Sequence, residues 1–249
     1  TELAEAFDLH GMSKSPAIFD INKLTHFNAM YLRALAPEKF AEVAEPYIRQ
    51  SVTKECYDAA AIAAGRDPKE ILLCAATKMN DADAVRQAIA AGVDCCGENR
   101  VQELTAKQKE NAYEGVPVHF IGRLQTNKVK QVVGKVDLIQ SVDRMKLLEA
   151  IQTEAAKQGI IQDILLEINI GREESKGGFL TEEIPELLSK MEAFSSIRVR
   201  GLMAIPPICQ NSSDNDKFFQ EMCNLSVDIG SKKYDNVSVE ILSMGMSDD

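Results

Sequence analysis

Short apolar runs separated by amphipathic segments dominate the chain from residue 71 to its end. The runs are rich in Val, Ile, Leu and Ala, and most are continuously apolar rather than alternating. That pattern is typical of parallel strands that are buried on both faces. We therefore predict strands at residues 71–78, 93–98, 118–123, 137–142, 163–170, 197–205 and 237–246.

The segments between these runs carry the signals of helices. Asp81 or Asp83 is placed to cap one helix, and Gly92 is placed to end it. Asp143 is placed to cap a second helix, and Thr181 begins another. The alternation of strands and helices indicates a parallel α/β protein.

Two parallel architectures fit this alternation, a doubly wound sheet and a (β/α) barrel. No G-x-G-x-x-G sequence follows the first predicted strand, which weakens the dinucleotide-binding form of the doubly wound sheet. A complete barrel needs eight strands, whereas seven are predicted here. We therefore predict an α/β fold of the (β/α)8 TIM-barrel type, truncated before the eighth strand, and expect the missing strand beyond Asp249.

Residues 1–52 have a different character, with short helical patterns and no predicted strand. Asp20 and Pro37 stand where helix starts are expected. The segment is too short to bury much core by itself. We predict a small helical appendage over residues 1–52 and a barrel over residues 53–249. Because the chain begins at Thr1 and ends directly after a predicted strand, we expect it to be a fragment.

Composition and charge limit the classes of function. Hydrophobic residues make up 45% and charged residues 27%, which is ordinary for a soluble globular protein. No apolar run approaches the roughly 20 residues that span a bilayer. The sequence also lacks a basic segment followed by an apolar stretch, which is the pattern of a secretory signal. We predict a cytoplasmic protein without membrane contact. The formal net charge, 28 − 38 = −10, disfavours nucleic-acid binding through phosphates.

The cysteines do not form a recognisable metal-binding sequence. No two of them have the C-x-x-C spacing, and two are adjacent, which is poor spacing for a zinc knuckle. We interpret them as reduced thiols rather than as a disulfide framework or a metal site. The six are Cys56, Cys74, Cys95, Cys96, Cys209 and Cys223.

Polar residues at the carboxyl ends of the predicted strands are candidates for a site, because barrel sites are built there. Lys78 ends the first strand; a desolvated lysine forms imines with carbonyl compounds, although a solvated strand-end lysine is the commoner case. Asn99 follows the second strand, where a ligand contact or a helix cap is expected. Met203 in the sixth strand suits a flat ring or simple core packing, and Ser243 in the seventh suits a phosphate or a tight turn. His119, within the third strand, fits a satisfied core residue better than a catalyst.

Each signal is weak alone, but their order along the chain is distinctive. From about residue 53 to its end, the chain resembles the pyridoxal-phosphate homeostasis protein family. The segments that carry this resemblance are AATK (75–78), GENRVQE (97–103), HFIGRLQTNK (119–128), INIGREESKGG (168–178), GLMAIPP (201–207) and LSMGMSDD (242–249).

The resemblance implies a barrel like the N-terminal domain of alanine racemase, without a second β domain. It implies that Lys78 forms the internal aldimine with pyridoxal 5′-phosphate, that Asn99 and Met203 line this cofactor, and that Ser243 contacts its phosphate. The family is regarded as a carrier or regulator of vitamin B6 pools without established catalysis, so we expect no catalytic residue and pyridoxal-phosphate-dependent apoenzymes as partners. The family pattern continues with an Arg-Ile-Gly phosphate loop and a last strand, which this sequence lacks.

Two other functions stay open. An enzyme of the alanine racemase type needs a second acid or base, usually a tyrosine, and none of the chain's tyrosines lies in a predicted barrel-mouth segment. Residues 3–52 resemble a part of glutamyl-tRNA synthetase, which raises a tRNA-associated module. We do not interpret the GMSKS sequence at 11–15 as a synthetase lysine loop, because the catalytic fold is missing. The charge of residues 1–52, 5 − 7 = −2, also argues against phosphate binding.

Overall fold

The computed structural model describes Asp58, residues 61–207 and residues 213–245. The chain divides into two units, Thr1–Pro68 and Lys69–Asp249. The helices predicted within residues 1–52, their starts at Asp20 and Pro37, and the GMSKS sequence lie outside the described residues. The fold described below is that of the second unit.

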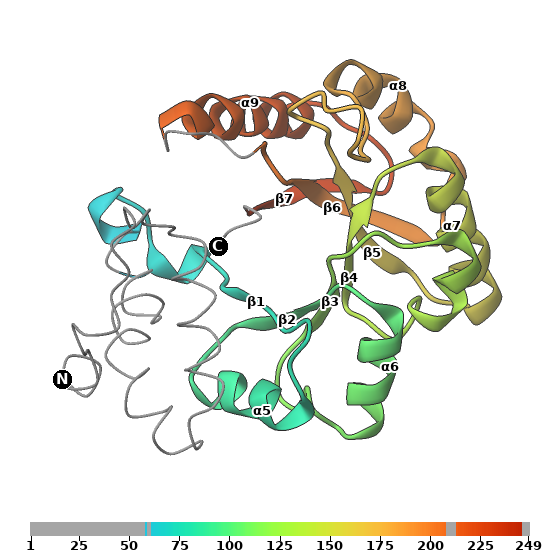
Figure 1. Cartoon of the computed structure of the whole chain (residues 1–249). Coiled ribbons are helices and arrows are strands. Elements are labelled where there is room, and N and C mark those ends of the chain that lie inside the picture. Colours follow the sequence, from blue (N-terminus) through green and yellow to red (C-terminus); the bar gives the residue numbers. More distant parts are fainter. Residues whose placement is uncertain (1–57, 59–60, 208–212, 246–249) are drawn as a thin grey trace, which may run out of the picture. The chain divides into compact units, whose positions relative to one another are not determined.

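Seven parallel strands form one sheet in the described part of the chain, and they follow one another in sequence order. Figure 1 shows this sheet curving into an incomplete ring with helices on its outer side. Each predicted strand overlaps an observed one, which confirms the expected (β/α)-barrel sheet with seven strands. The strands are β1 (Cys74–Ala76), β2 (Cys95–Glu98), β3 (Val118–Phe120), β4 (Leu138–Val142), β5 (Gln162–Glu167), β6 (Ile197–Ala204) and β7 (Val237–Met244).

Helical segments connect every pair of successive strands. The α-helices are α5 (Ala82–Ala90), α6 (Val101–Lys109), α7 (Met145–Gln158), α8 (Ile184–Ser189) and α9 (Ser213–Gly230). The 3-10 turns are η2 (Pro68–Glu70), η3 (Thr126–Gln131), η4 (Thr181–Glu183) and η5 (Met191–Ala193). Between β3 and β4 the connection is the short turn η3 alone.

The predicted ends of α5 are confirmed, whereas the predicted start of α7 is wrong. The side chain of Asp81 accepts a hydrogen bond from a backbone N–H of the first turn of α5, and Gly92 follows the helix with a φ of 95°. Asp143 does not cap α7, which begins after Arg144 without a side-chain cap. Its carboxylate instead pairs with the guanidinium of Arg144 and lies 3.7 Å from that of Arg123.

The sheet separates two sets of buried side chains. A large core fills the space between the strands and the outer helices, and it includes Ile164 and Leu166 of β5. Leu165, between them, belongs to a second cluster with Leu138 and Met203. Because successive strand residues point to opposite faces, this second cluster lies inside the ring. Met203 therefore faces the interior.

Candidate functional site

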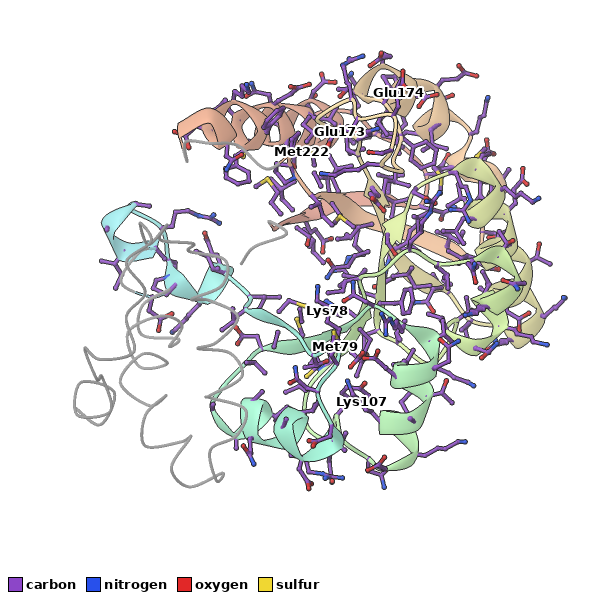
Figure 2. All side chains as sticks on the ribbon, in the orientation of Figure 1. Lys78, Met79, Lys107, Glu173, Glu174 and Met222 are labelled. Atoms are coloured by element: carbon purple, nitrogen blue, oxygen red, sulfur yellow. The ribbon has the colours of Figure 1, made fainter. Side chains whose placement is uncertain are left out.

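Lys78 lies two residues beyond the end of β1, at the carboxyl edge of the sheet. Figure 2 shows Lys78 within the curve of the sheet and Lys107 between the sheet and α6. The Lys78 side chain is exposed, and within the described part of the chain its ammonium group has no hydrogen-bond or ion-pair partner. Its amine is therefore accessible to a ligand.

The residue before Lys78, Thr77, is fixed by hydrogen bonds of its N–H, its hydroxyl and its carbonyl. The N–H of Thr77 donates to the carbonyl of Gly97 on β2 at 3.0 Å. Its hydroxyl donates to Oε1 of Glu98 at 2.6 Å, and its carbonyl accepts from Nζ of Lys107 at 2.7 Å. The second strand and the helix that follows it therefore set the position of the Lys78 backbone.

The residue after Lys78 is held from the same helix. Met79 has a φ of 63°, a conformation that costs energy for a side chain of this kind. Its N–H donates to Oε2 of Glu103, on the first turn of α6, at 2.8 Å. Lys78 is thus a freely exposed side chain on a backbone that is restrained on both sides.

A buried ion pair lies beneath this segment. Oε1 of Glu98 is 2.6 Å from Nζ of Lys107, with Glu98 fully buried and Lys107 5% exposed. The hydroxyl of Tyr113 donates to the same oxygen at 2.9 Å. Burial, together with this carboxylate, raises the pKa of Tyr113. Glu98 falls within one of the resembling segments, but its burial was not predicted, since its partners are 9 and 15 residues away.

Asn99 directly follows β2 and is half-buried. It does not cap α6, because the residue at that position is Arg100. Its Oδ1 is buried and has no hydrogen-bond partner among the described residues. The backbone of Asn99 is packed closely by Gly122, where an added Cβ would lie 2.2 Å from the Asn99 carbonyl oxygen. An acceptor that is unused among the described residues, on a closely packed backbone, fits the predicted ligand contact better than the predicted cap.

Met203 and Ser243 are register partners on β6 and β7. Met203 is 4% exposed, within the cluster inside the ring. The hydroxyl of Ser243 donates to Oε1 of Gln140 at 2.7 Å, and the amide nitrogen of Gln140 lies 2.8 Å from Nδ1 of His119. The structure thus brings Met203 and Ser243 together across neighbouring strands, while Lys78 and Asn99 follow β1 and β2. Their predicted roles toward a cofactor stay predictions.

Glu167 is a titratable residue that was not among the predicted site residues. It ends β5, is the register partner of Met203, and is half-buried. Burial, and secondarily the carboxylate of Asp143, raises the pKa of Glu167 from 4.5 to about 6, although Arg123 and Arg144 oppose the shift. The sequence signal that could have identified Glu167 is an acidic residue at the end of an apolar strand.

The raised pKa predicts a pH-dependent effect of Glu167→Gln. The folded state binds the Glu167 proton more tightly than the unfolded state does, so protonation of Glu167 stabilises the fold. This contribution is fully present below pH 4.5 and is lost as the pH rises through about 6. The free energy of unfolding of the variant should equal that of the wild type at pH 4 and should be about 2 kcal/mol higher at pH 7, because Gln carries no charge to bury. Urea unfolding across this pH range measures the difference. The exposed Glu149→Gln is the control, and an equal difference at both pH values would contradict the prediction.

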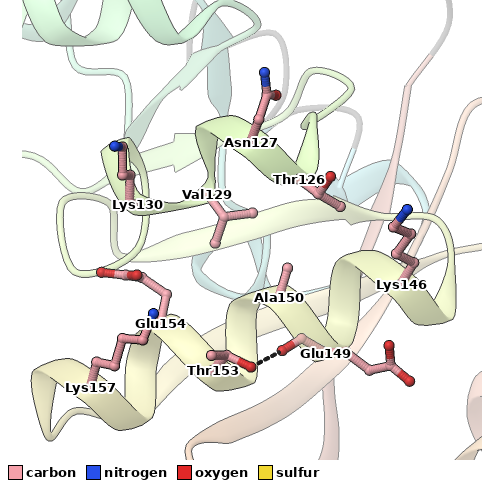
Figure 3. Close-up of a pocket in the computed structure, with 10 residues that line it drawn as sticks. All are labelled: Thr126, Asn127, Val129, Lys130, Lys146, Glu149, Ala150, Thr153, Glu154 and Lys157. Atoms are coloured by element: carbon pink, nitrogen blue, oxygen red, sulfur yellow. Dashed lines mark hydrogen bonds between the residues drawn. The ribbon is translucent and has the colours of Figure 1, made fainter.

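A separate hollow lies on the outer side of the ring, between η3 and α7. It has a volume of about 370 Å³ and is lined by Thr126, Lys130, Lys146, Glu149 and Lys157, among others (Figure 3). A smaller hollow of about 140 Å³ lies at the strand ends and includes Asn99, Arg123 and Lys128. The larger hollow contains none of the predicted site residues, so size alone does not mark the site.

Among the described helices, none combines the length and apolarity required to cross a bilayer.

The chain is similar to known proteins over the part that forms the barrel. Residues 60–249 match the family model described as alanine racemase, N-terminal domain. A pyridoxal phosphate homeostasis protein from Aquifex aeolicus is 41% identical over 186 residues, which are 75% of this chain and 81% of the relative. The solved structure of PipY from Synechococcus elongatus with PLP bound is 31% identical, has a TM-score of 0.63, and is covered for 88% of its length by 76% of this chain.

Alanine racemase itself is a more distant neighbour. The Clostridium difficile enzyme is 13% identical, with a TM-score of 0.56, and the match covers 72% of this chain and 47% of the enzyme. At this level of identity the likeness concerns the fold alone.

Proposed function

This chain belongs to the pyridoxal phosphate homeostasis protein family, and we propose that it binds pyridoxal 5′-phosphate as a Schiff base on Lys78. The observation that carries the proposal is the exposed ammonium group of Lys78, which has no partner among the described residues, on a backbone restrained by Thr77 and Met79. Such a side chain can reach a ligand while its attachment point stays fixed. The relative from Synechococcus elongatus, solved with PLP bound, supports the choice of cofactor.

The other predicted residues fit this cofactor. The buried Oδ1 of Asn99 lacks a partner in the described part of the chain and can accept a hydrogen bond from a ligand. Met203 offers an apolar, polarisable surface to a flat ring, and Ser243 would contact the phosphate. When bound, pyridoxal phosphate supplies an aldehyde that condenses reversibly with a primary amine and releases water. Lys78 presents that amine, and the other three residues bind and orient.

We propose a carrier in vitamin B6 homeostasis rather than an enzyme. Racemase chemistry needs a second acid or base, and the described tyrosines are engaged elsewhere. Tyr113 donates its hydroxyl to Glu98 on the helix side of the sheet, and Tyr234 packs against the outer core. Reversible capture of a reactive aldehyde suits storage and delivery. The proposed recipients are pyridoxal-phosphate-dependent apoenzymes in the cytoplasm.

Residues 1–52 are proposed to form a helical segment that is separate from the cofactor-binding barrel of residues 53–249. The family match begins at residue 60, which supports this division. The negative charge of the segment, 5 − 7 = −2, disfavours the tRNA-associated alternative.

Borohydride trapping tests the proposed function. The full chain is incubated with pyridoxal phosphate, reduced with borohydride, digested and analysed by mass spectrometry. We expect one dominant adduct, on Lys78, because its amine is both exposed and positioned. An equal distribution over exposed lysines such as Lys109 and Lys130, or a dominant adduct elsewhere, would remove Lys78 from the proposal.

A further inference from the structure

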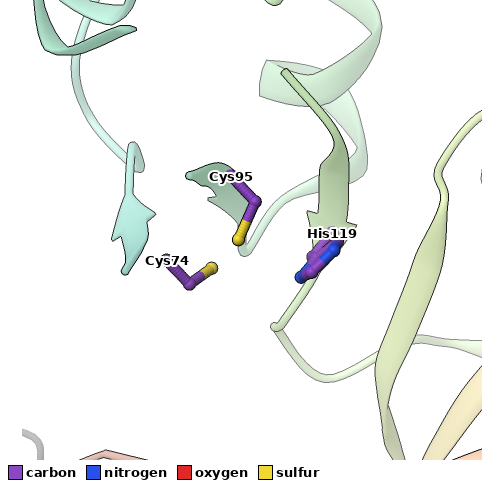
Figure 4. Close-up of side chains that lie close together, drawn as sticks. All are labelled: Cys74, Cys95 and His119. Carbon is purple, nitrogen blue, oxygen red and sulfur yellow. The ribbon is translucent and has the colours of Figure 1, made fainter. Parts of the chain in front are cut away.

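Three potential metal ligands converge inside the ring, and none of them is a residue assigned to the cofactor. Cys74, Cys95 and His119 lie on the three successive strands β1, β2 and β3. The two sulfur atoms and a ring nitrogen of His119 all lie within 4.8 Å of one another. Figure 4 shows the three side chains pointing toward a common space. They are separated by 21 and 24 residues in the sequence, so strand register rather than a local sequence motif brings them together.

The geometry suits a tetrahedral cation. Zinc binds thiolate sulfur at about 2.3 Å and imidazole nitrogen at about 2.0–2.1 Å, which places its ligand atoms about 3.5–3.8 Å apart. The separations of at most 4.8 Å therefore need only small side-chain movements. Two thiolates also neutralise a divalent cation. Neutralisation is needed because a net charge is costly to bury, and here Cys95 is only 2% exposed and the other two residues are half-buried.

A second layer of contacts holds the imidazole. Gln140 lies 2.8 Å from Nδ1 of His119, and its amide also accepts from the Ser243 hydroxyl. Metal-binding histidines commonly use one ring nitrogen for the metal and donate the N–H of the other to an acceptor such as a carboxylate, a carbonyl or water. As placed, the amide nitrogen of Gln140 donates to Nδ1, which puts the imidazole hydrogen on Nε2. Turning the Gln140 amide over presents its oxygen to Nδ1–H and its nitrogen to the Ser243 hydroxyl, and this frees the lone pair of Nε2 for a cation.

We propose that Cys74, Cys95 and His119 bind one Zn²⁺ inside the ring, with the fourth position taken by water. Binding releases the two thiol protons, and the thiolates then balance the charge of the cation. The site shares β1 with Lys78 but uses none of the residues assigned to pyridoxal phosphate. It is therefore a second site, and it does not depend on the proposed cofactor function.

The test uses the full chain with Cys56, Cys209 and Cys223 replaced by serine. The protein is reduced, stripped with a chelator, incubated with Zn²⁺ and dialysed, and its zinc content is measured by mass spectrometry of the metal. We expect one equivalent of zinc, which falls to near zero in Cys95→Ser and in the milder His119→Gln. Co²⁺ in place of Zn²⁺ should give thiolate charge-transfer and tetrahedral d–d absorption that both variants lose.

Two control variants distinguish this site from zinc binding at the neighbouring thiol or at Lys78. Cys96→Ala changes the adjacent thiol, which belongs to the outer core, and should retain one equivalent of zinc. Lys78→Ala should also retain it, even where pyridoxal phosphate capture is lost. Zinc retention that is unchanged in both Cys95→Ser and His119→Gln would overturn the proposal. So would a stripped, reduced protein that takes up no zinc.

Discussion

Lys78→Ala is expected to abolish covalent capture of pyridoxal phosphate and to change the free energy of unfolding by less than about 0.5 kcal/mol. The large functional effect follows because the variant lacks the amine that condenses with the aldehyde. The small stability effect follows because the side chain is exposed and has no partner in the described part of the chain. Borohydride trapping measures the first quantity, and urea unfolding measures the second.

Two further variants control this experiment. Lys109→Ala removes an exposed lysine from the end of α6 and should leave capture at the wild-type level. Lys78→Arg keeps the positive charge but removes the amine, so it should fail like the alanine variant. If Lys78→Arg still gave a reduced adduct of wild-type yield, another lysine would be the attachment point. A loss of several kcal/mol in Lys78→Ala would show a structural role instead.

The fold could be predicted because its signals are local. Seven continuous apolar runs mark strands buried on both faces, and Asp81 and Gly92 mark the ends of one helix through bonds and angles within a few residues. Asp143 misled because its position before a helix is typical of a cap, while its actual partners are the guanidinium groups of Arg123 and Arg144. The attraction of the Asp143 carboxylate to these arginines therefore prevails over helix capping, and the local sequence pattern does not indicate this.

The site was only partly predictable, because its remaining parts depend on pairing between strands. Lys78 and Asn99 stand at strand ends, where a sequence pattern can place them. The burial of Glu98 depends on a lysine that reaches back from α6, and the sulfur of Cys95 meets Cys74 only through the register of β1 and β2. Neither relation has a fixed spacing in sequence. The polar framework behind Lys78, which Thr77, Glu98 and Lys107 form, therefore could not be predicted before the strands were placed.

That framework predicts a large effect of Lys107→Met. The variant removes the cation from a pair in which Glu98 is fully buried, and it takes the Nζ donor away from the Thr77 carbonyl. Removing one partner of a buried ion pair costs about 3–5 kcal/mol, because the other charge stays buried without compensation. We expect a loss of this size in urea unfolding at pH 7. The exposed Lys109→Met, on the same helix, should change the free energy of unfolding by less than about 0.5 kcal/mol.

The double variant Glu98→Gln/Lys107→Met distinguishes charge from packing. It removes both buried charges, so it should recover much of the stability that Lys107→Met loses. Capture of pyridoxal phosphate should recover less, because Thr77 still lacks the hydrogen bond from Nζ that helps to fix the Lys78 backbone. Rates of adduct formation, measured beside the unfolding curves, test this separation. If the double variant were no more stable than Lys107→Met, the loss would come from packing rather than from the unpaired carboxylate. Full recovery of the capture rate would show that the ion pair stabilises the fold without positioning Lys78.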